Sequence, residues 1–327
     1  MTKRLAGKTV LVTGGAGFIG SHLCEELLEK GARVICLDNL FTGKKENIAH
    51  LLPNRRFIFV KGDVNRERVL KKVFSGRKID YVFHYAAVLG VKRVTEQPLL
   101  VLPDIFGIKN VLEQARAHKV KKVVFASSSE AYGDTAELPL REDNGRDMVH
   151  HAHHTHLYAL VKLMGERIMK LYNDKYGLPT VSLRFFNVFG PRQESSAYGF
   201  VVGVFIEQII NNQSPTVFGD GYQTRDFIFV KDNVRLAIKA LLTPKTNGEV
   251  INIGAGRQTT ILDLALKLIQ ISGKKLKPKF LPARPHEIKY RSPDITKMRR
   301  LLGETIPNQL EENLQLTYEW YLNKRKK

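Results

Sequence analysis

Tyr158 and Lys162 stand four residues apart in the segment YALVK. In a helix this spacing puts both side chains on one face, where an ammonium can lie beside a phenol. A positive charge there favours the phenolate and lowers a phenol pKa that is normally near ~10, so the tyrosine could act as a general base. Most Tyr/Lys pairs at this spacing are exposed surface residues. The surrounding sequence therefore has to distinguish a surface pair from a catalytic one.

Hydroxyl groups and a carboxylate precede this pair. Residues 127–133 read SSSEAYG and follow an apolar run at residues 122–126 that predicts a buried strand. The polar side chains would then lie at the carboxyl end of a strand, where ligands bind in open α/β sheets. We expect Tyr158 and Lys162 to meet them there.

The elements that must position these residues alternate along the chain. Alternating strand and helix patterns predict an α/β fold, with a doubly wound parallel sheet and helices on both faces. Residues 227–230 and 250–253 also have strand patterns, so the chain is expected to return to the sheet there. The expected strands are residues 9–12, 32–37, 57–60, 79–84 and 122–126, and the expected helices are residues 21–30, 104–118 and 309–322.

The first strand runs into a glycine turn. Gly14, Gly17 and Gly20 form GxxGxxG, where a Cβ would obstruct the turn, the approach of a pyrophosphate and the packing of helix on strand. The backbone N–H groups and dipole at the start of the next helix favour phosphate. This pattern predicts a Rossmann-like dinucleotide site.

Asp38 ends the second expected strand, 18 residues beyond Gly20. A carboxylate at this spacing accepts both ribose hydroxyls and repels a 2′-phosphate, so we expect NAD rather than NADP, although Asp38 could also merely cap a turn. Ala86 and Ala87 let backbone pass close to a cofactor, or only allow tight helix packing. The expected cofactor-binding residues are Gly14, Gly17, Phe18, Ile19, Gly20, Asp38, Asn39, Asp63, Val64, Ala86, Ala87, Tyr158 and Lys162.

Composition limits the other classes. The 327 residues carry a net charge of +20, which could indicate nucleic-acid binding, but basic pairs such as Lys121-Lys122 are dispersed at expected element ends and no RNA-binding or helix-turn-helix signature accompanies them. We therefore expect a solvated basic surface that attracts anionic substrates. No apolar run reaches membrane-spanning length and no secretory leader is apparent, and Cys24 and Cys36 fit core positions in a reducing compartment, so a cytoplasmic location is expected.

With these motifs in hand, the chain resembles the extended short-chain dehydrogenase/reductases that modify nucleotide sugars, the NAD-dependent epimerase/dehydratase family. The likeness covers nearly the whole chain, including RFFNVFGPR at 184–192, TVFGDG at 216–221, QTRDF at 223–227 and NIG at 252–254. It implies a catalytic triad of Ser128, Tyr158 and Lys162. It also implies a homodimer and two domains, with residues 1–186 plus 226–254 binding NAD and residues 187–225 plus 255–327 forming a smaller α/β domain for the nucleotide sugar.

The resemblance also implies substrate contacts and a reaction. Substrate-binding residues would be Ser128, Ser129, Asn187, Arg225 and Arg284, and an arginine offers a planar fork to phosphate oxygens. For Arg225 a salt bridge with Asp226 is the alternative. Tyr158 would take the C4 hydroxyl proton while hydride passes to NAD, giving a 4-keto sugar.

Glu130 separates the possible outcomes of that oxidation. The best match is a UDP-sugar 4-epimerase similar to UDP-glucose 4-epimerases. Glu130 is typical instead of 4,6-dehydratases and UDP-glucuronate decarboxylases, and residues 291–295, RSPDI, resemble the decarboxylases. Glu130 could also accept backbone N–H bonds at a helix start. A non-catalytic NAD-binding module is the remote alternative.

Three features depart from the family pattern. Five histidines within residues 150–156 could bind a metal, although we expect no metal and favour a pH-sensitive loop beside the sugar pocket. Ile108 and Asp104 stand where relatives usually have threonine and asparagine. The sequence offers no physical reason for these two replacements.

Overall fold

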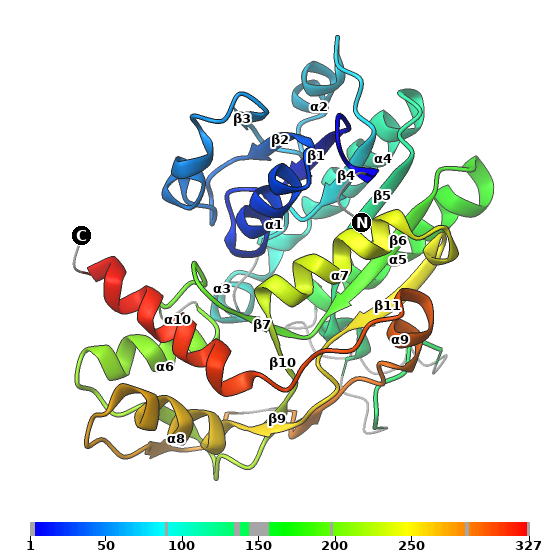
Figure 1. The fold of residues 1–327 in the computed structure, drawn as a ribbon. Helices are drawn as coiled ribbons and strands as arrows, with labels where there is room; N and C mark the ends of the chain where they lie inside the picture. The colour runs from blue at the N-terminus through cyan, green and yellow to red at the C-terminus, as the bar shows by residue number, and fades with distance from the viewer. Residues whose placement is uncertain are drawn as a thin grey trace.

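A seven-stranded parallel sheet forms the centre of the computed structural model (Figure 1). The structure describes residues 4–88, 91–133, 138–143, 157–196, 199–284 and 288–325, and the histidine-rich residues 150–156 lie outside these ranges. The strand order places β4 beside β1, so the chain reverses direction of winding between them and leaves a crevice at their carboxyl ends. In spatial order the strands are β11 (Glu249–Ile253), β6 (Thr180–Phe185), β5 (Lys122–Ser128), β4 (Tyr81–His84), β1 (Thr9–Thr13), β2 (Arg33–Asp38) and β3 (Phe57–Lys61).

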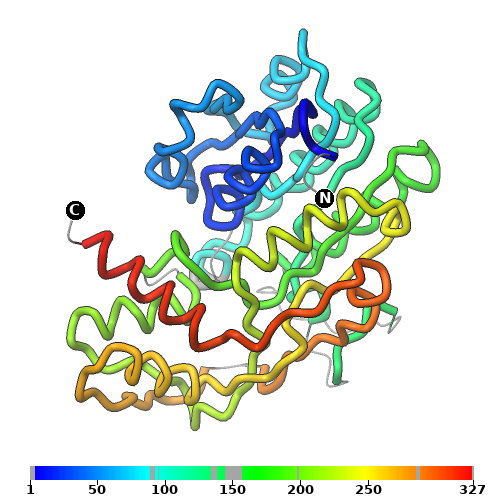
Figure 2. The backbone as a smooth tube through the Cα atoms, viewed as in Figure 1, coloured from blue at the N-terminus to red at the C-terminus, as the bar shows by residue number. Residues whose placement is uncertain are grey.

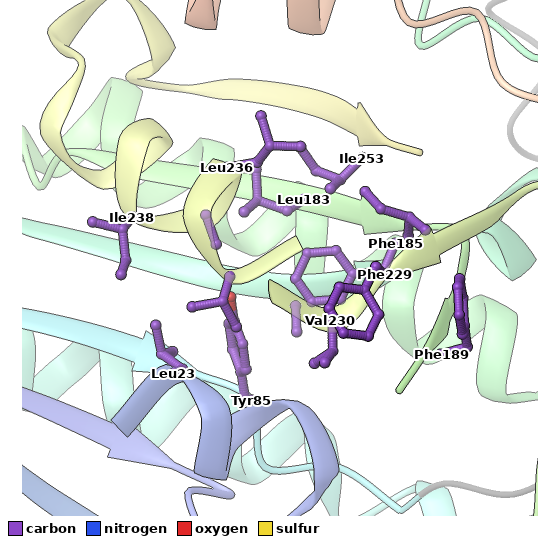
Figure 3. Packing of buried hydrophobic residues seen from close by; sticks show 14 of the residues in the cluster. Leu23, Tyr85, Leu183, Phe185, Phe189, Phe229, Val230, Leu236, Ile238 and Ile253 are labelled. Carbon is purple, nitrogen blue, oxygen red and sulfur yellow. The ribbon is translucent and has the colours of Figure 1, made fainter. Parts of the chain in front are cut away.

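Helices cover both faces of this sheet, as the alternating pattern predicts. Val10 and Val12 of β1 point into a layer with α1 and α7, whereas Leu11 between them points into a layer with α2 and α4. Figure 3 shows side chains of α1, α7 and the sheet meeting in the first layer. The helices are α1 (Phe18–Glu29), α2 (Glu67–Phe74), α3 (Val91–Glu96), α4 (Asp104–Ala117), α5 (Leu157–Tyr176) and α7 (Val230–Leu242), with short 3₁₀ turns η2 (Lys45–Leu51), η3 (Pro98–Val101), η4 (Ser129–Tyr132) and η6 (Pro244–Thr246).

A smaller lobe is assembled from two segments that are distant in sequence. Figure 2 shows the light-green chain after residue 190 gathered with the orange and red chain after residue 255. Helices α6, α8 and α10 pack together in this lobe. Its elements are β7 (Asn187–Phe189), α6 (Val201–Ile210), β8 (Thr216–Phe218), β9 (Thr224–Arg225), β10 (Phe227–Phe229), β12 (Thr259–Thr260), α8 (Ile261–Ser272), β13 (Lys279–Leu281), β14 (Tyr290–Arg291) and α10 (Leu310–Arg325), while α9 (Thr296–Leu302) packs against β11 and α7.

The return of the chain to the sheet differs from the expectation for residues 227–230. β11 joins the seven-stranded sheet beside β6, but β10 pairs with β7 in a separate two-stranded sheet. Val230 already begins α7, because the apolar residues from there onward recur at helical spacing and pack on the sheet. Only one of the two strand patterns therefore belongs to the main sheet.

Lys122 is another difference. We expected it to contribute to the solvated basic surface, but it is buried, and its ammonium donates to the carbonyls of Ala240 and Thr243 at 3.0 Å and to Thr246 Oγ1 at 2.6 Å. It thereby satisfies carbonyls at the C-terminal end of α7. In the described ranges, no helix is both long enough and apolar enough to span a bilayer.

Candidate active site

The glycine turn has no room for side chains. Gly14 has φ of +70°, and a Cβ there would lie 2.8 Å from the backbone nitrogen of Ala86, at the end of the neighbouring strand β4. A Cβ on Gly20 would lie 2.1 Å from the carbonyl oxygen of Gly14. Helix α1 begins at Phe18, three residues earlier than expected, directly after Gly17. Its first-turn N–H groups therefore face the turn and can bind an anion.

A cavity of about 350 Å³ extends from this turn to the ends of β4 and β5. Every residue expected to bind the cofactor lines it. Ser128, Ser129, Glu130 and Asn187 line it as well. The structure thus brings together residues from positions 14 to 187 at the carboxyl edge of the sheet.

Asp38 is held rigidly at one end of the cavity. One carboxylate oxygen accepts a hydrogen bond from the Ala16 N–H at 2.9 Å, and the other accepts one from the Leu40 N–H at 2.8 Å. Burial raises the pKa of Asp38 in spite of these bonds. Each oxygen keeps a second lone pair for a ribose hydroxyl, so the cradle of glycines together with this carboxylate fits the adenosine end of NAD.

Lys162 lies beside Tyr158 at the other end. Lys162 is buried, its nitrogen donates to the Ala126 carbonyl at 2.7 Å, and it lies 5.5 Å from the centre of the Tyr158 ring. The two residues share one face of α5, as their spacing predicts.

The protein groups around Tyr158 change its pKa in both directions. Burial raises it above its ordinary value, the negative charges of Glu130 and Asp104 raise it further, and a hydrogen bond with Ser128 lowers it. Burial also lowers the pKa of Lys162 to about 8. Burial therefore opposes the phenolate, and the positive charges of Lys162 and of an oxidised nicotinamide would have to offset it.

The Glu130 side chain is directed toward the smaller lobe. Its backbone N–H donates to Ser128 Oγ at 3.2 Å, and its exposed carboxylate forms an ion pair with the buried guanidinium of Arg291. Arg291 also donates to the Gly133 carbonyl at 3.3 Å. This pair joins η4 to β14 across 161 residues of sequence.

The arginines expected to bind substrate lie farther out. Arg225 and Arg284 are not among the residues that line the cavity. The Arg225 guanidinium donates to the Thr224 carbonyl at 2.8 Å, and the Arg284 guanidinium stacks 3.9 Å above the Phe218 ring. The Asp226 carboxylate accepts from the backbone N–H groups of residues 255 and 257 at 2.7 and 2.8 Å, so it anchors a turn.

Comparison with known proteins identifies the family of this chain. The model of the family described as "NAD dependent epimerase/dehydratase family" matches residues 10–254. The chain belongs to this family. Its relatives include a putative UDP-glucose 4-epimerase of Methanocaldococcus jannaschii, 39% identical over 78% of this chain and 79% of the relative. A UDP-N-acetyl-alpha-D-glucosaminuronate decarboxylase of Bacillus cytotoxicus is 37% identical over 96% of this chain and 98% of the relative.

A solved structure agrees in both fold and cofactor. UDP-glucuronic acid 4-epimerase from Bacillus cereus, in complex with UDP-glucuronic acid and NAD, superposes with a TM-score of 0.85 at 35% identity, covering 96% of this chain and 99% of that one. This member of the epimerase/dehydratase family is thus an NAD-dependent enzyme.

Two arginines of the RFFNVFGPR segment have partners that the sequence did not reveal. Arg192 lines the cavity, and its guanidinium donates two hydrogen bonds, of 3.0 and 2.6 Å, to the Glu25 carboxylate of α1. Arg184 is fully buried and binds both oxygens of Glu166 at 2.9 and 2.7 Å, while Ser127 donates to the same carboxylate at 2.5 Å. The resemblance located the segment, but no sequence signal pairs these residues.

Proposed function

We propose that this enzyme inverts the configuration at C4 of a UDP-sugar through a 4-keto intermediate. The observation that carries the proposal is the convergence of Ser128, Tyr158 and Lys162 on the cavity that contains the glycine turn. A base for a sugar hydroxyl thereby lies beside a site that fits a hydride acceptor. Epimerases among the relatives and solved structures support the same reaction.

Each of the three side chains has a separate part in this step. Tyr158 takes the proton from the C4 hydroxyl and returns it after the keto sugar has presented its other face. Ser128 hydrogen-bonds Tyr158 and orients the hydroxyl. Lys162, fixed on the Ala126 carbonyl, supplies the charge that favours the phenolate. NAD bound in this cavity would supply the acceptor for the C4 hydride and its donor on return.

We propose that the diphosphate of the substrate binds at the smaller lobe. Asn187 lines the cavity and marks the boundary between the lobes, and Arg225 and Arg284 lie beyond it. Their guanidinium groups would bind phosphate oxygens through paired N–H donors. Loss of either arginine should raise KM for a UDP-sugar and leave NAD affinity unchanged, which isothermal titration with NAD would check.

The decisive experiment is NMR of the products formed with NAD in D₂O from UDP-glucose, UDP-N-acetylglucosamine and UDP-glucuronate. A C4 epimer without deuterium at C5 supports the proposal. The Tyr158→Phe variant, which removes the base and keeps the ring, should lose at least ~10²-fold in kcat. A 4-keto-6-deoxy product or carbon dioxide, formed without any C4 epimer, would refute it.

Decarboxylation of a UDP-hexuronate is the second candidate, and the carboxyl group of Glu130 in the cavity wall and a decarboxylase among the relatives favour it. Oxidation at C4 turns the C5 carboxylate into a β-keto acid, which loses carbon dioxide and leaves an enolate that needs a proton at C5. Glu130 lines the cavity, and in its protonated form it would deliver this proton and become the carboxylate that pairs with Arg291. Release of carbon dioxide from UDP-glucuronate, with the C5-protonated product lost in Glu130→Gln, would establish this reaction, whereas absence of carbon dioxide with the native enzyme would exclude it.

We also propose a homodimer built on α4 and α5. Leu160, Met164 and Leu171 follow one face of α5 and are exposed, and Phe106 of the adjoining α4 is 62% exposed. An apolar face of this kind fits a second copy of the same helix pair. Light scattering should give twice the 37.1 kDa chain mass, and Phe106→Glu with Met164→Glu should give the single mass.

A cytoplasmic location is part of the proposal. Cys24 and Cys36 are free and buried, and free cysteines are typical of reducing compartments. Cell fractionation would test this assignment, and recovery of the enzyme outside the cytoplasm would contradict it.

A further inference from the structure

Asp104 is a buried carboxylate inside the cavity. It begins α4, is 8% exposed, and accepts a hydrogen bond from the Val88 N–H at 3.0 Å. Val88 belongs to the segment that leaves β4 and carries Ala86, whose backbone lies against Gly14. Asp104 therefore fixes the backbone on one side of the cofactor cradle. An asparagine oxygen could accept the same bond, so this contact alone does not explain why the residue is charged.

A negative charge nearby would keep the buried Lys162 ammonium protonated. It is 4% exposed, and its hydrogen bond goes to the Ala126 carbonyl, which is neutral. Apolar side chains of Val88, Ile105 and Val161 pack around Tyr158 in the same corner. Charges in such a poorly solvated place interact strongly, and a lysine there tends to lose its proton.

Two carboxylates act on Lys162, and they differ in their own partners. Glu166 is bound on both oxygens by Arg184 and also accepts from Ser127. The charge of Glu166 is therefore largely balanced. Asp104 and Lys162 line the same cavity, and their neighbours Ile105 and Val161 belong to one apolar cluster with Tyr158. In the described part of the chain Asp104 forms no ion pair with an arginine, and its negative charge raises the pKa of Lys162. Asp104 is thus the counter-charge available to the lysine.

We propose that the Asp104 carboxylate is a positioning residue that keeps the Lys162 ammonium charged beside Tyr158. The inference rests on the proposed function, in which Tyr158 and Lys162 act as base and charge donor. It gives a physical reason for a charge at a buried position where a neutral oxygen would suffice for the Val88 bond.

The charge of Asp104 should set the pH range of the reaction. The active form requires a deprotonated Tyr158 and a protonated Lys162. A negative charge raises the pKa of both groups, so its removal should move both limbs of the pH profile to lower pH. The other groups that face this corner are unchanged in every variant. Glu130 and Ser128 act on Tyr158, and Glu166 and His84 lie around Lys162. Asp63 acts on Asp104.

The test separates charge from hydrogen bonding. Asp104→Asn keeps an oxygen for Val88 and removes the charge, and Asp104→Ser is a second neutral variant in case the first fails to fold. Asp104→Glu restores the charge. Glu113→Gln, on the exposed side of the same helix and paired only with Lys109 among the described ion pairs, is the matched control for the loss of one charge.

The first readout does not depend on turnover. In protein labelled at lysine ¹³Cε, the Lys162 resonance is assigned by its absence in Lys162→Arg and titrated with pH. We expect its midpoint to fall by ~1 pH unit in Asp104→Asn, to recover in Asp104→Glu and to stay unchanged in Glu113→Gln. An unchanged midpoint in both neutral variants would overturn the inference.

The second readout is kcat/KM against pH with the substrate identified by NMR. Both limbs should move to lower pH by ~1 unit in Asp104→Asn, with the largest loss of activity on the alkaline side. A merely structural role would lower activity equally at all pH values and would contradict the inference. If the Lys162 midpoint shifts but the native enzyme converts no nucleotide sugar, the proposed function fails while the inference stands.

Discussion

The buried pair Glu166–Arg184 allows a sharp test of how the site is supported. Arg184 of β6 is 1% exposed and Glu166 of α5 is 3% exposed, and two parallel hydrogen bonds of 2.9 and 2.7 Å join them. Arg184→Met removes the guanidinium and leaves a carboxylate in the core, where Ser127 still donates a hydrogen bond to it. Breaking a buried pair from one side costs about 3–5 kcal/mol, because the remaining charge has lost its partner.

The assay is urea unfolding followed by circular dichroism, with a double-mutant cycle. Arg184→Met and Glu166→Leu should each destabilise by about 3–5 kcal/mol. The double variant removes both charges and should cost less than the sum of the two by at least ~2 kcal/mol. Asp174→Asn is the matched control, since the Lys170–Asp174 pair lies on the exposed side of the same helix and should contribute less than ~0.5 kcal/mol. Additive single effects, or a cost of Arg184→Met below ~1 kcal/mol, would refute the reasoning.

Three further predictions follow from contacts described above. Gly20→Ala should weaken NAD binding at least ~10-fold by calorimetry, because its Cβ meets the Gly14 carbonyl and the turn must move; Gly303→Ala, with φ of +61° and nothing within 4 Å, should leave affinity unchanged. Lys122→Met should destabilise by about 2–3 kcal/mol and speed amide exchange at the end of α7, and unchanged exchange would contradict the capping role. Burial lowers the pKa of His84 to about 3, so the unfolded chain binds an extra proton below its ordinary pKa near ~6.5 and stability should fall between those values as pH falls; His84→Gln should flatten this part of the Tm profile, and an unaltered profile would show that other groups cause it.

Local sequence patterns predicted much of the fold and of the cofactor site. The glycine spacing, the apolar strands and the carboxylate at the end of β2 are short-range features, and each has its structural meaning within some 30 residues. Period and turn chemistry therefore predicted the doubly wound sheet. The strand pattern at residues 227–230 failed because a short apolar run does not specify its pairing partner, and the actual partner was β7.

Burial decided what the sequence could not. The i, i+4 spacing placed Lys162 beside Tyr158, but the pKa values of both depend on the apolar walls around them, which come from three separate helices and turns. Lys122 shows the same limit, because a basic pair at a strand end looks exposed until α7 is packed over it.

The sequence by itself determined the class of fold, the dinucleotide turn, the Tyr158/Lys162 pair and the resemblance that locates the sugar-nucleotide segments, because these depend on residue types at fixed short spacings. Only the tertiary structure decided that Glu130 meets Arg291, that Arg184 pairs with Glu166, and that Asp104 and Lys162 line one cavity. Whether two charged groups interact depends on their distance in space and on the exclusion of water between them. Neither the distance nor the solvent exclusion can be read from positions along the chain.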